Sequence, residues 1–179
     1  MAATGRATKL TGAVGEFLVA AELCRSGLLA TPFAGNVPHY DIIASGQSGG
    51  HVAVQVKAIN GLTTWQFDIR KFVDVQLDGK RQIVKEPLPE PFPGLIVVLV
   101  VLITTGRDRF FILEWKELQE TLVSGYKTYL AKHDGIRPRA PESFHTALSI
   151  SDVERFKGEW DTILRRVPKR DTSEDPESR

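Results

Sequence analysis

The stretch HVAVQVKA, residues 51–58, decides the fold class of this chain. Its three valines alternate with Ala53, Gln55 and Lys57. Such alternation is typical of a β-strand, because successive side chains of a strand point to opposite faces of the sheet. We therefore predict a strand with one face made of valine, while the other face carries an amide and an amine.

Further strands are predicted on both sides of this stretch. The segment TWQFDI, residues 64–69, alternates in the same way. The run 95–103 is rich in Val and Ile, which is typical of a buried strand. The remaining expected strands are an extended piece at 28–33, a strand at 39–44, and a strand at 109–114 that pairs with the run 95–103.

Two long helices are predicted at 11–26 and 116–132, and Ser151 and Glu154 predict a capping box for a last helix. The expected buried faces carry Val14, Phe17, Leu18, Ala21, Cys24 and Leu28 in the first helix, and Leu118, Leu122, Tyr126 and Leu130 in the second. The segments 85–94 and 134–148 are expected to be loops. The order helix, strands, helices predicts an α/β layer fold with a mixed sheet.

Composition narrows the domain organisation and the function classes. The length of 179 residues fits one domain over 1–167, and 168–179 are expected to form a disordered polar tail. With 23 Lys and Arg against 22 Asp and Glu, the net charge of +1 excludes a binder with a wholly basic surface, but not a small phosphate-binding cleft. The single cysteine excludes an intrachain disulfide and a zinc site of several thiolates.

The sequence also bears on membrane contact and on nucleotide motifs. No segment reaches the roughly 18 apolar residues of a membrane span, and the first residues, MAATGRATKL, lack the apolar core of a secretory signal. A cytoplasmic location without membrane contact is therefore expected. The sequence contains no P-loop, no Gly-rich dinucleotide fingerprint and no G-x-S-x-G elbow.

Four polar residues stand in segments where burial or solubility alone does not account for them: Glu16, Asp41, Gln55 and Lys57. Glu16 has no cation three or four residues away on its predicted helix, so no local ion pair explains its carboxylate. Asp41 opens an apolar strand, and Gln55 and Lys57 share one strand face. These groups suit metal-dependent phosphodiester hydrolysis. Carboxylates hold an oxygen-seeking ion such as Mg²⁺, the ion polarises the phosphate and activates water, and an ammonium stabilises the transition-state charge.

Each of these residues also has a purely structural interpretation. Glu16 would then lie at a solvated helix edge, and Asp41 would stabilise a turn. Lys57 would point to water from a half-buried strand. A coincidental motif in a protein-interaction domain would require Asp41 and Lys57 to lie far apart in space.

Three segments that carry these residues resemble the PD-(D/E)xK nuclease superfamily, and most closely its archaeal Holliday-junction resolvase and Mrr-like branches. GAVGEFLVAAELCRSGL (12–28) is similar to the opening helix of that family, GNVPHYDIIA (35–44) to the strand with the family aspartate, and AVQVKA (53–58) to the (D/E)xK strand. The likeness covers residues 10–60. It implies a restriction-endonuclease-like core, with a central mixed β-sheet flanked by helices.

The resemblance also implies residue roles, a cofactor and a substrate. Glu16, Asp41 and Gln55 would be metal ligands together with the backbone carbonyl of Val56, and Lys57 would position or activate the attacking water. The implied cofactor is Mg²⁺, with Mn²⁺ as a possible substitute, and the implied substrate is DNA. The implied function is that of a DNA endonuclease of the resolvase or restriction type. Because resolvase-like relatives often act as dimers, a homodimer is also expected.

Two residues depart from the family pattern. Tyr40 stands where proline is usual before the aspartate, which many members tolerate. Gln55 stands at the second acidic position, and an amide coordinates Mg²⁺ without negative charge and cannot act as a base. Some active branches resemble this QxK form. The alternative is a catalytically inactive module of the same fold, which binds nucleic acid or serves as an assembly subunit.

Four further residues are candidates for nucleic-acid contacts. His39 lies beside Asp41 in the sequence, and Arg137 and Arg139 lie in a proline-containing loop from which they would contact phosphates. Trp65 would line a groove and stack on bases. The structural alternatives are a surface loop for His39, a solvated loop for the arginines and an ordinary alternating strand for Trp65.

Overall fold

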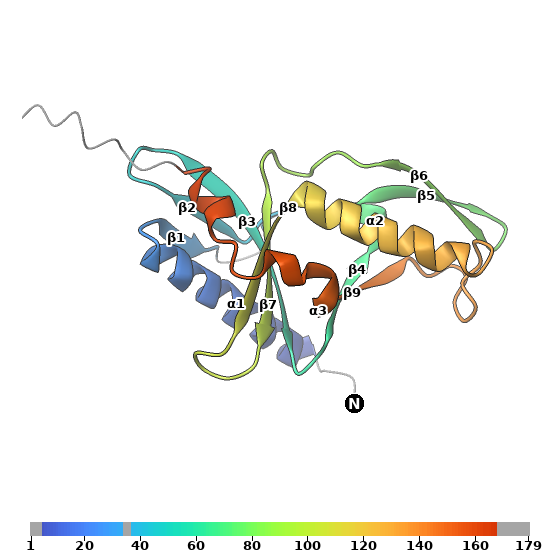
Figure 1. Ribbon diagram of the computed structural model, residues 1–179, viewed down its shortest axis with the longest axis horizontal. Coiled ribbons are helices and arrows are strands. Elements are labelled where there is room, and N and C mark those ends of the chain that lie inside the picture. The colour runs from blue at the N-terminus through green and yellow to red at the C-terminus, as the bar shows by residue number, and fades with distance from the viewer. Residues whose placement is uncertain (1–4, 34–36, 168–179) are drawn as a thin grey trace, which may run out of the picture.

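The computed structural model describes residues 5–33 and 37–167, so the predicted tail at 168–179 lies outside the described residues. A five-stranded sheet with the order β1-β2-β3-β7-β8 forms its centre (Figure 1). Each strand overlaps one expected from the sequence. The strands are β1 (Leu29–Pro32), β2 (Ile42–Ser45), β3 (His51–Asn60), β7 (Ile96–Leu102) and β8 (Arg109–Glu114).

The middle strand, β3, makes this sheet mixed. It pairs antiparallel with β2, where Ile42 lies opposite Val54, and parallel with β7, where Val56 lies opposite Val98. β7 pairs antiparallel with β8. β7 is buried from its start through Val101, as expected for a strand that is covered on both faces. The predicted α/β fold with a central mixed sheet flanked by helices is confirmed.

Helices cover both faces of the sheet (Figure 1). α1 (Gly5–Arg25) packs on the face that carries the valines of β3, and α2 (Trp115–Ala131) packs on the opposite face. A hydrophobic core lies on each side of the sheet. The buried face of α2 carries the predicted residues Leu118, Leu122, Tyr126 and Leu130. No described helix is long and apolar enough to cross a membrane.

α1 approaches β3 closely because a glycine faces the strand. A Cβ atom on Gly15 would lie 2.6 Å from the Cβ of Ala58 and 3.5 Å from Cγ1 of Val56. Glycine therefore lets the helix backbone pack directly against β3. The next residue, Glu16, is carried to the sheet by the same contact.

The buried face of α1 differs from the predicted one. Four of the predicted core residues are exposed, namely Val14, Phe17, Ala21 and Cys24. The residues that are buried instead are mostly small: Gly15, Val19, Ala20 and Leu23. The prediction is wrong because the helix carries two apolar stripes, and the close approach to β3 selects the stripe with the smaller side chains.

The structure contains three strands that the sequence did not predict, β5 (Val73–Asp78), β6 (Arg81–Pro87) and β9 (His145–Ser149). The expected loops at 85–94 and 134–148 are both partly strand. A 3₁₀ turn, η1 (Ile69–Lys71), leads from the predicted strand at 64–69 into a hairpin. The two additional sheets pair β4 (Thr64–Asp68) with β9, and β5 with β6.

The predicted last helix is broken into short segments. Its capping box is formed by Ser149 and Asp152, not by Ser151 and Glu154. Gly158, with φ at +72°, interrupts the helical course. The segments are α3 (Ile150–Val153), η2 (Glu154–Phe156) and α4 (Asp161–Leu164).

We expect Gly15→Ala to destabilise the protein, because the new Cβ would overlap Ala58. Overpacking a tight contact costs about 1–3 kcal/mol. The higher helix propensity of alanine returns about 1 kcal/mol of this loss. Urea denaturation should therefore show a net decrease of up to about 2 kcal/mol in the free energy of unfolding.

Gly12→Ala is the matched control on the same helix. A Cβ on Gly12 meets only Glu16 Oε1, at 3.9 Å, so this variant gains helix propensity without a clash and is expected to be slightly stabilised. The double variant Gly15→Ala with Ala58→Gly should recover part of the loss. Equal effects of the two glycine substitutions would contradict the close packing of α1 on β3.

Candidate functional site

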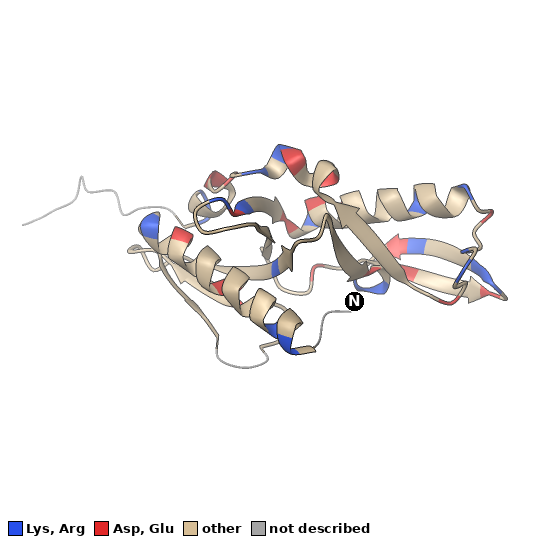
Figure 2. Ribbon diagram, turned by 90° about the horizontal axis from the view of Figure 1, so that it is seen from below, with Lys and Arg blue, Asp and Glu red and all other residues tan. Residues whose placement is uncertain are grey.

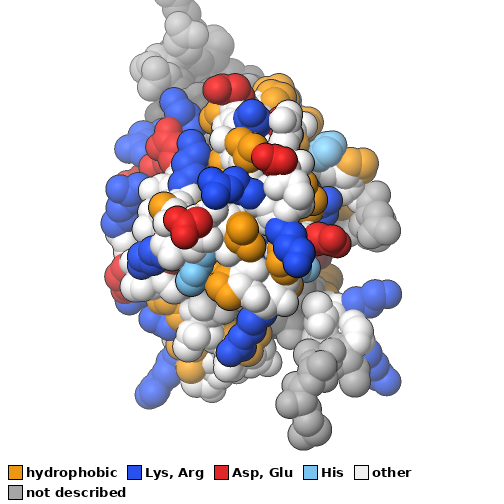
Figure 3. Space-filling model, turned by 90° about the vertical axis from the view of Figure 1, so that its right-hand side faces the viewer, with side chains coloured by type: hydrophobic (Ala, Val, Ile, Leu, Met, Phe, Trp, Pro, Cys, Tyr) orange, Lys and Arg blue, Asp and Glu red, His pale blue; other side chains and the backbone are white. Residues whose placement is uncertain are grey.

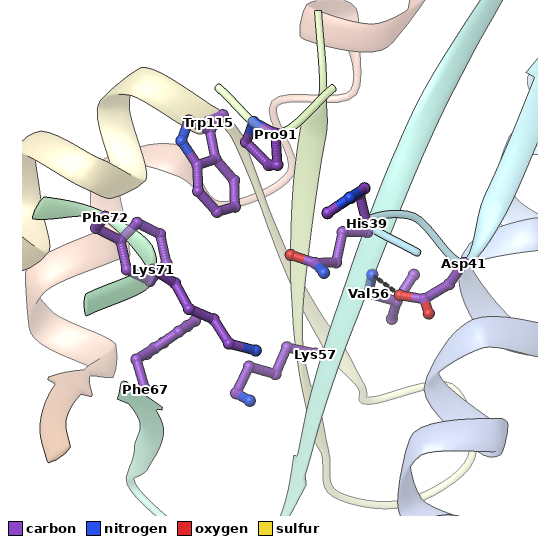
Figure 4. Close-up of a pocket in the computed structure, with 10 residues that line it drawn as sticks. His39, Asp41, Val56, Lys57, Phe67, Lys71, Phe72, Pro91 and Trp115 are labelled. Atoms are coloured by element: carbon purple, nitrogen blue, oxygen red, sulfur yellow. Dashed lines mark hydrogen bonds between the residues drawn. The ribbon is translucent and has the colours of Figure 1, made fainter. Parts of the chain in front are cut away.

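A cavity of about 490 Å³ opens on the α2 side of β3 (Figure 4). Its walls come from β3, the segment before β2, the end of β4, η1 and the start of α2. The lining residues are His39, Asp41, Gln55, Val56, Lys57, Phe67, Lys71, Phe72, Pro91 and Trp115. Four of the residues singled out from the sequence motif, Asp41, Gln55, Val56 and Lys57, therefore meet in one cavity.

Hydrogen bonds fix Asp41 just before β2. Its backbone N–H donates to the carbonyl oxygen of Val54 at 2.9 Å, and its carbonyl oxygen accepts from the N–H of Phe33 at 2.9 Å. Its side-chain Oδ2 accepts a hydrogen bond from the N–H of Val56 at 2.7 Å (Figure 4). Because Val56 stands between Gln55 and Lys57, this bond places the carboxylate at the point of β3 from which the amide and the amine project.

Gln55 and Lys57 project from the face of β3 that lies opposite α1. The Nζ atom of Lys57 lies 4.9 Å from the centre of the Phe67 ring, a cation–π contact. Burial lowers the pKa of Lys57, the ammonium of Lys71 lowers it further, and Asp41 opposes both effects. Lys57 forms no salt bridge with any described residue. The interpretation of Lys57 as a side chain that simply points to water does not hold.

Glu16 reaches the site from the other side of the sheet. It lies on α1 and does not line the cavity. Between Lys9 and Glu22 it is the one charged residue of α1, whose charged side chains Figure 2 colours. Burial raises the pKa of Glu16, and the negative charge of Asp41 raises it further. The charge of Asp41 therefore acts on Glu16 of α1 as well as on Lys57 of β3.

The pKa values of both carboxyl groups are raised. Burial raises the pKa of Asp41, against the opposing effects of the Val56 N–H and the Lys57 ammonium. The charges of Asp41 and Glu16 also repel each other, and a cation between them would relieve that repulsion.

The donor set of the site fits a hard divalent ion. Two carboxylates and one amide oxygen are the ligand types that Mg²⁺ accepts, with water molecules completing the octahedron. Within 5–33 and 37–167, no group of three or more His, Cys, Asp or Glu side chains is placed to hold a metal. The site thus supplies two negative charges, fewer than an all-carboxylate triad.

The residues beside Asp41 have distinct surroundings. His39 is exposed at the cavity, with φ at +77°, a left-handed conformation that is uncommon outside glycine. Its predicted contact with nucleic acid stays a prediction. Tyr40 packs edge-on against the rings of Phe33 and Phe92, at 5.6 and 5.0 Å between ring centres.

The prediction that Trp65 stacks on bases is wrong. Its side chain is 0% exposed and packs against the ring of Phe111. Its Nε1–H donates to the backbone carbonyl of Lys57 at 2.9 Å. Trp65 therefore supports the strand that carries the site residues and presents no free ring face to a ligand.

Arg137 and Arg139 lie beyond the C-terminal end of α2, whereas the cavity lies at its N-terminal end. The helix has 17 residues, which corresponds to about 25 Å at its usual rise of 1.5 Å per residue. Arg137 donates to the carbonyl of His145 at 2.6 Å and lies over the ring of Tyr129. Figure 3 faces this end of the molecule, where Lys and Arg side chains lie among Asp and Glu. Phosphate contacts by these arginines stay a prediction, and the cavity does not include them.

Sequence reasoning missed Lys71 and the aromatic wall of the cavity. Phe72 stacks on Trp115 at 4.6 Å between ring centres, and Phe67 meets Phe72 edge-on. In the sequence, Lys71 is simply a lysine between Arg70 and Phe72, just after the predicted strand at 64–69. Nothing in that pattern distinguishes it from an ordinary surface lysine.

Comparisons with known proteins add a structural likeness. The chain is similar to the solved structure of a bacterial homing endonuclease, I-Ssp6803I, with 15% sequence identity and a TM-score of 0.48, over 88% of this chain and 93% of that one. No protein-family model matches the sequence, and no curated protein matches it.

We expect Asp41→Asn to raise the free energy of unfolding of the metal-free protein at pH 7, and Asp41→Ala to lower it. Asparagine keeps an acceptor for the Val56 N–H and removes a desolvated charge, a gain below about 1 kcal/mol because Asp41 is only partly buried. Alanine leaves that N–H without a partner, which costs about 1–3 kcal/mol. Urea denaturation of both variants measures the difference.

The pH dependence of the same pair tests the raised pKa of Asp41. With its pKa raised above the ordinary 3.8, the folded protein takes up this proton at a higher pH than the unfolded chain does. The metal-free natural chain should therefore gain stability relative to Asp41→Asn as the pH falls from neutral toward that value. If the stability of Asp41→Asn relative to the natural chain increased as the pH fell, the raised pKa of Asp41 would be contradicted.

Proposed function

We propose that this protein is a metal-dependent DNA endonuclease of the resolvase or restriction type, with a PD-(D/E)xK-like site in its QxK form. The observation that carries the proposal is the hydrogen bond from the Val56 N–H to Asp41 Oδ2. It joins the aspartate to the strand residue that stands between Gln55 and Lys57. Two segments distant in sequence, those of Asp41 and of the QxK strand, meet through this bond, and we include Glu16 on α1 as the third segment because the resemblance implies it.

The proposed metal ligands are the carboxylates of Asp41 and Glu16, the amide oxygen of Gln55 and the backbone carbonyl of Val56. A Mg²⁺ or Mn²⁺ ion bound there would polarise the phosphate and lower the pKa of a coordinated water. Three hydrogen bonds fix Asp41. The close packing of Gly15 on β3 supports the inclusion of its neighbour Glu16, because it holds that part of α1 against the strand of Gln55 and Lys57.

Lys57 acts on the substrate side of the site. Its ammonium lies in the cavity, partly desolvated and without a carboxylate partner among the described residues. From there it would orient the attacking water and stabilise the charge that develops on the phosphate oxygens. The Phe67 ring beneath its Nζ atom keeps the side chain in the cavity.

A second candidate is a catalytically inactive module of the same fold that binds nucleic acid or serves as an assembly subunit. Gln55 favours it, because the site has no third carboxylate and the amide cannot act as a base. In that case DNA would bind in the cavity region and stay intact with either metal.

The proposal includes association into a homodimer. Leu10, Val14 and Phe17 form an apolar stripe along the outer side of α1, with exposed fractions of 58, 46 and 66%. A contiguous exposed apolar stripe of this kind is typical of an interaction surface. A second copy of the chain would bury it and leave the cavity, on the other face of the sheet, open to DNA.

We expect Asp41→Asn and Lys57→Met to lower cleavage of supercoiled plasmid or junction DNA by about 10²–10³-fold or more with Mg²⁺ or Mn²⁺. Both variants keep the fold, because the hydrogen bond to Val56 has an acceptor in the first and the aliphatic stem is retained in the second. Gel assays of cleavage, with thermal unfolding measured in parallel, check this expectation.

Glu16→Gln and Glu22→Gln form a matched pair on α1. Glu22 pairs with Arg25 at 2.7 Å on the surface, so its amide variant should cut as the natural chain does, whereas Glu16→Gln should cut more slowly. DNA that stays intact with the natural chain under every metal would favour the inactive module. Cutting that survives Asp41→Asn would refute the site.

Gln55→Glu should tighten binding of Mn²⁺ by about tenfold, which corresponds to about 1.4 kcal/mol, because it adds a third carboxylate to the ligand set. Gln66→Glu on β4 adds the same charge outside the cavity lining and is the control. Isothermal titration with Mn²⁺ measures both variants. An unchanged affinity of Gln55→Glu would show that residue 55 is not a ligand.

A further inference from the structure

Two ammonium groups share the cavity. Lys57 projects from β3 and Lys71 from η1, and Figure 4 shows both side chains reaching into the same space from different walls. Two ammonium groups in one cavity repel each other, so this arrangement is unfavourable unless an anion lies between them. An anion bound there would remove the repulsion.

The η1 turn fixes the position of Lys71. The residues Ile69 and Phe72 are 0% and 2% exposed, and the N–H of Phe72 donates to the carbonyl of Ile69 at 2.9 Å. Asp68 caps the turn by accepting from the N–H of Arg70 at 3.1 Å, and it pairs with the Arg70 guanidinium at 2.6 Å. The backbone of Lys71 is therefore held at both ends, and its side chain extends from a rigid base.

Lys71 differs from its neighbour Arg70 in having no ion-pair partner among the described residues. Among the described residues that line the cavity, Asp41 is the one carboxylate, and it accepts a hydrogen bond from the backbone N–H of Val56. The lining residues from β4 and η1, Phe67 and Lys71, therefore present aromatic carbon and positive charge. The acid of these two elements, Asp68, is paired with Arg70 and does not line the cavity. This is the chemistry of an anion site.

We propose that Lys71 is a phosphate-binding residue of this cavity, which together with Lys57 holds a phosphate group of the DNA backbone without the help of a metal ion. The identity of the anion as a phosphodiester rests on the proposed function. Each ammonium is a compact point charge with rotatable donors, so the pair fits the two nonbridging oxygens of one phosphate without demanding a fixed approach. Lys71 acts in binding and not as a catalytic group.

The test is DNA binding by the full chain in EDTA, where no cleavage occurs. Fluorescence anisotropy with a labelled duplex, at several salt concentrations, should show that Lys71→Ala weakens binding by about tenfold. The slope of log K against log salt should fall by about one, as expected for one lost phosphate contact. Lys71→Arg keeps the charge and should bind within about threefold of the natural chain.

Lys9→Ala is the matched control, because it removes the same charge from α1, on the other face of the sheet. It should leave the affinity unchanged. Equal binding by Lys71→Ala and the natural chain overturns the proposal, as does an equal loss in Lys9→Ala. Failure of the natural chain to bind the duplex, or binding of inorganic phosphate alone through Lys71, also overturns it.

This outcome is separate from that of the proposed nuclease function. DNA that binds through Lys71 but is never cut with Mg²⁺ or Mn²⁺ refutes the nuclease and leaves the phosphate site standing. Cutting that depends on Asp41 but is indifferent to Lys71, with normal binding in EDTA, refutes the phosphate site alone.

Discussion

The candidate site depends on one hydrogen bond between a side chain and a strand backbone. Asp41 lies before β2, and without the Val56 N–H its carboxylate would have no fixed relation to Gln55 and Lys57. The antiparallel pairing of β2 with β3 brings the two segments together, and the bond to Val56 then sets the orientation of the carboxylate within that pairing. A backbone donor suits this role because its position is determined by the sheet and does not vary with rotamer.

Strand periodicity made much of the fold predictable. HVAVQVKA alternates strictly and the run 95–103 is continuously apolar, and the two segments form adjacent strands, β3 and β7, of the central sheet. α1 was harder, since its sequence offers two apolar stripes and only contact with β3 selects the one that contains Gly15. β9 and the broken C-terminal helices were also beyond local patterns, because β9 is stabilised by pairing with β4, far away in the sequence.

The site itself was predictable in part, for a different reason. Asp41, Gln55 and Lys57 stand out because polar groups interrupt apolar strands, and the sheet then gathers them. Trp65 looked available to a ligand because alternation does not say which face of a strand is covered, and its ring is fully buried. Lys71 could not be found, because its role follows from the turn at η1 and from proximity to Lys57, and neither is encoded as a local pattern.

The site holds like charges together in two places: Glu16 repels Asp41, and Lys71 repels Lys57. Both repulsions cost stability in the protein without ligands, and the proposed cation and the proposed phosphate would each relieve one of them.

The parallel pairing of β3 with β7 has a consequence for how the molecule forms. Val54 lies opposite Ile96, so the segment that contains the motif finds its central partner only after β4, η1 and the β5–β6 hairpin have been made. Closing so large a loop is slow, since its entropy must be lost before the strand contacts are gained. During synthesis on the ribosome, the partners of β3 in α1 and β2 have already emerged, whereas its pairing with β7 would wait until the chain has emerged at least as far as Leu102.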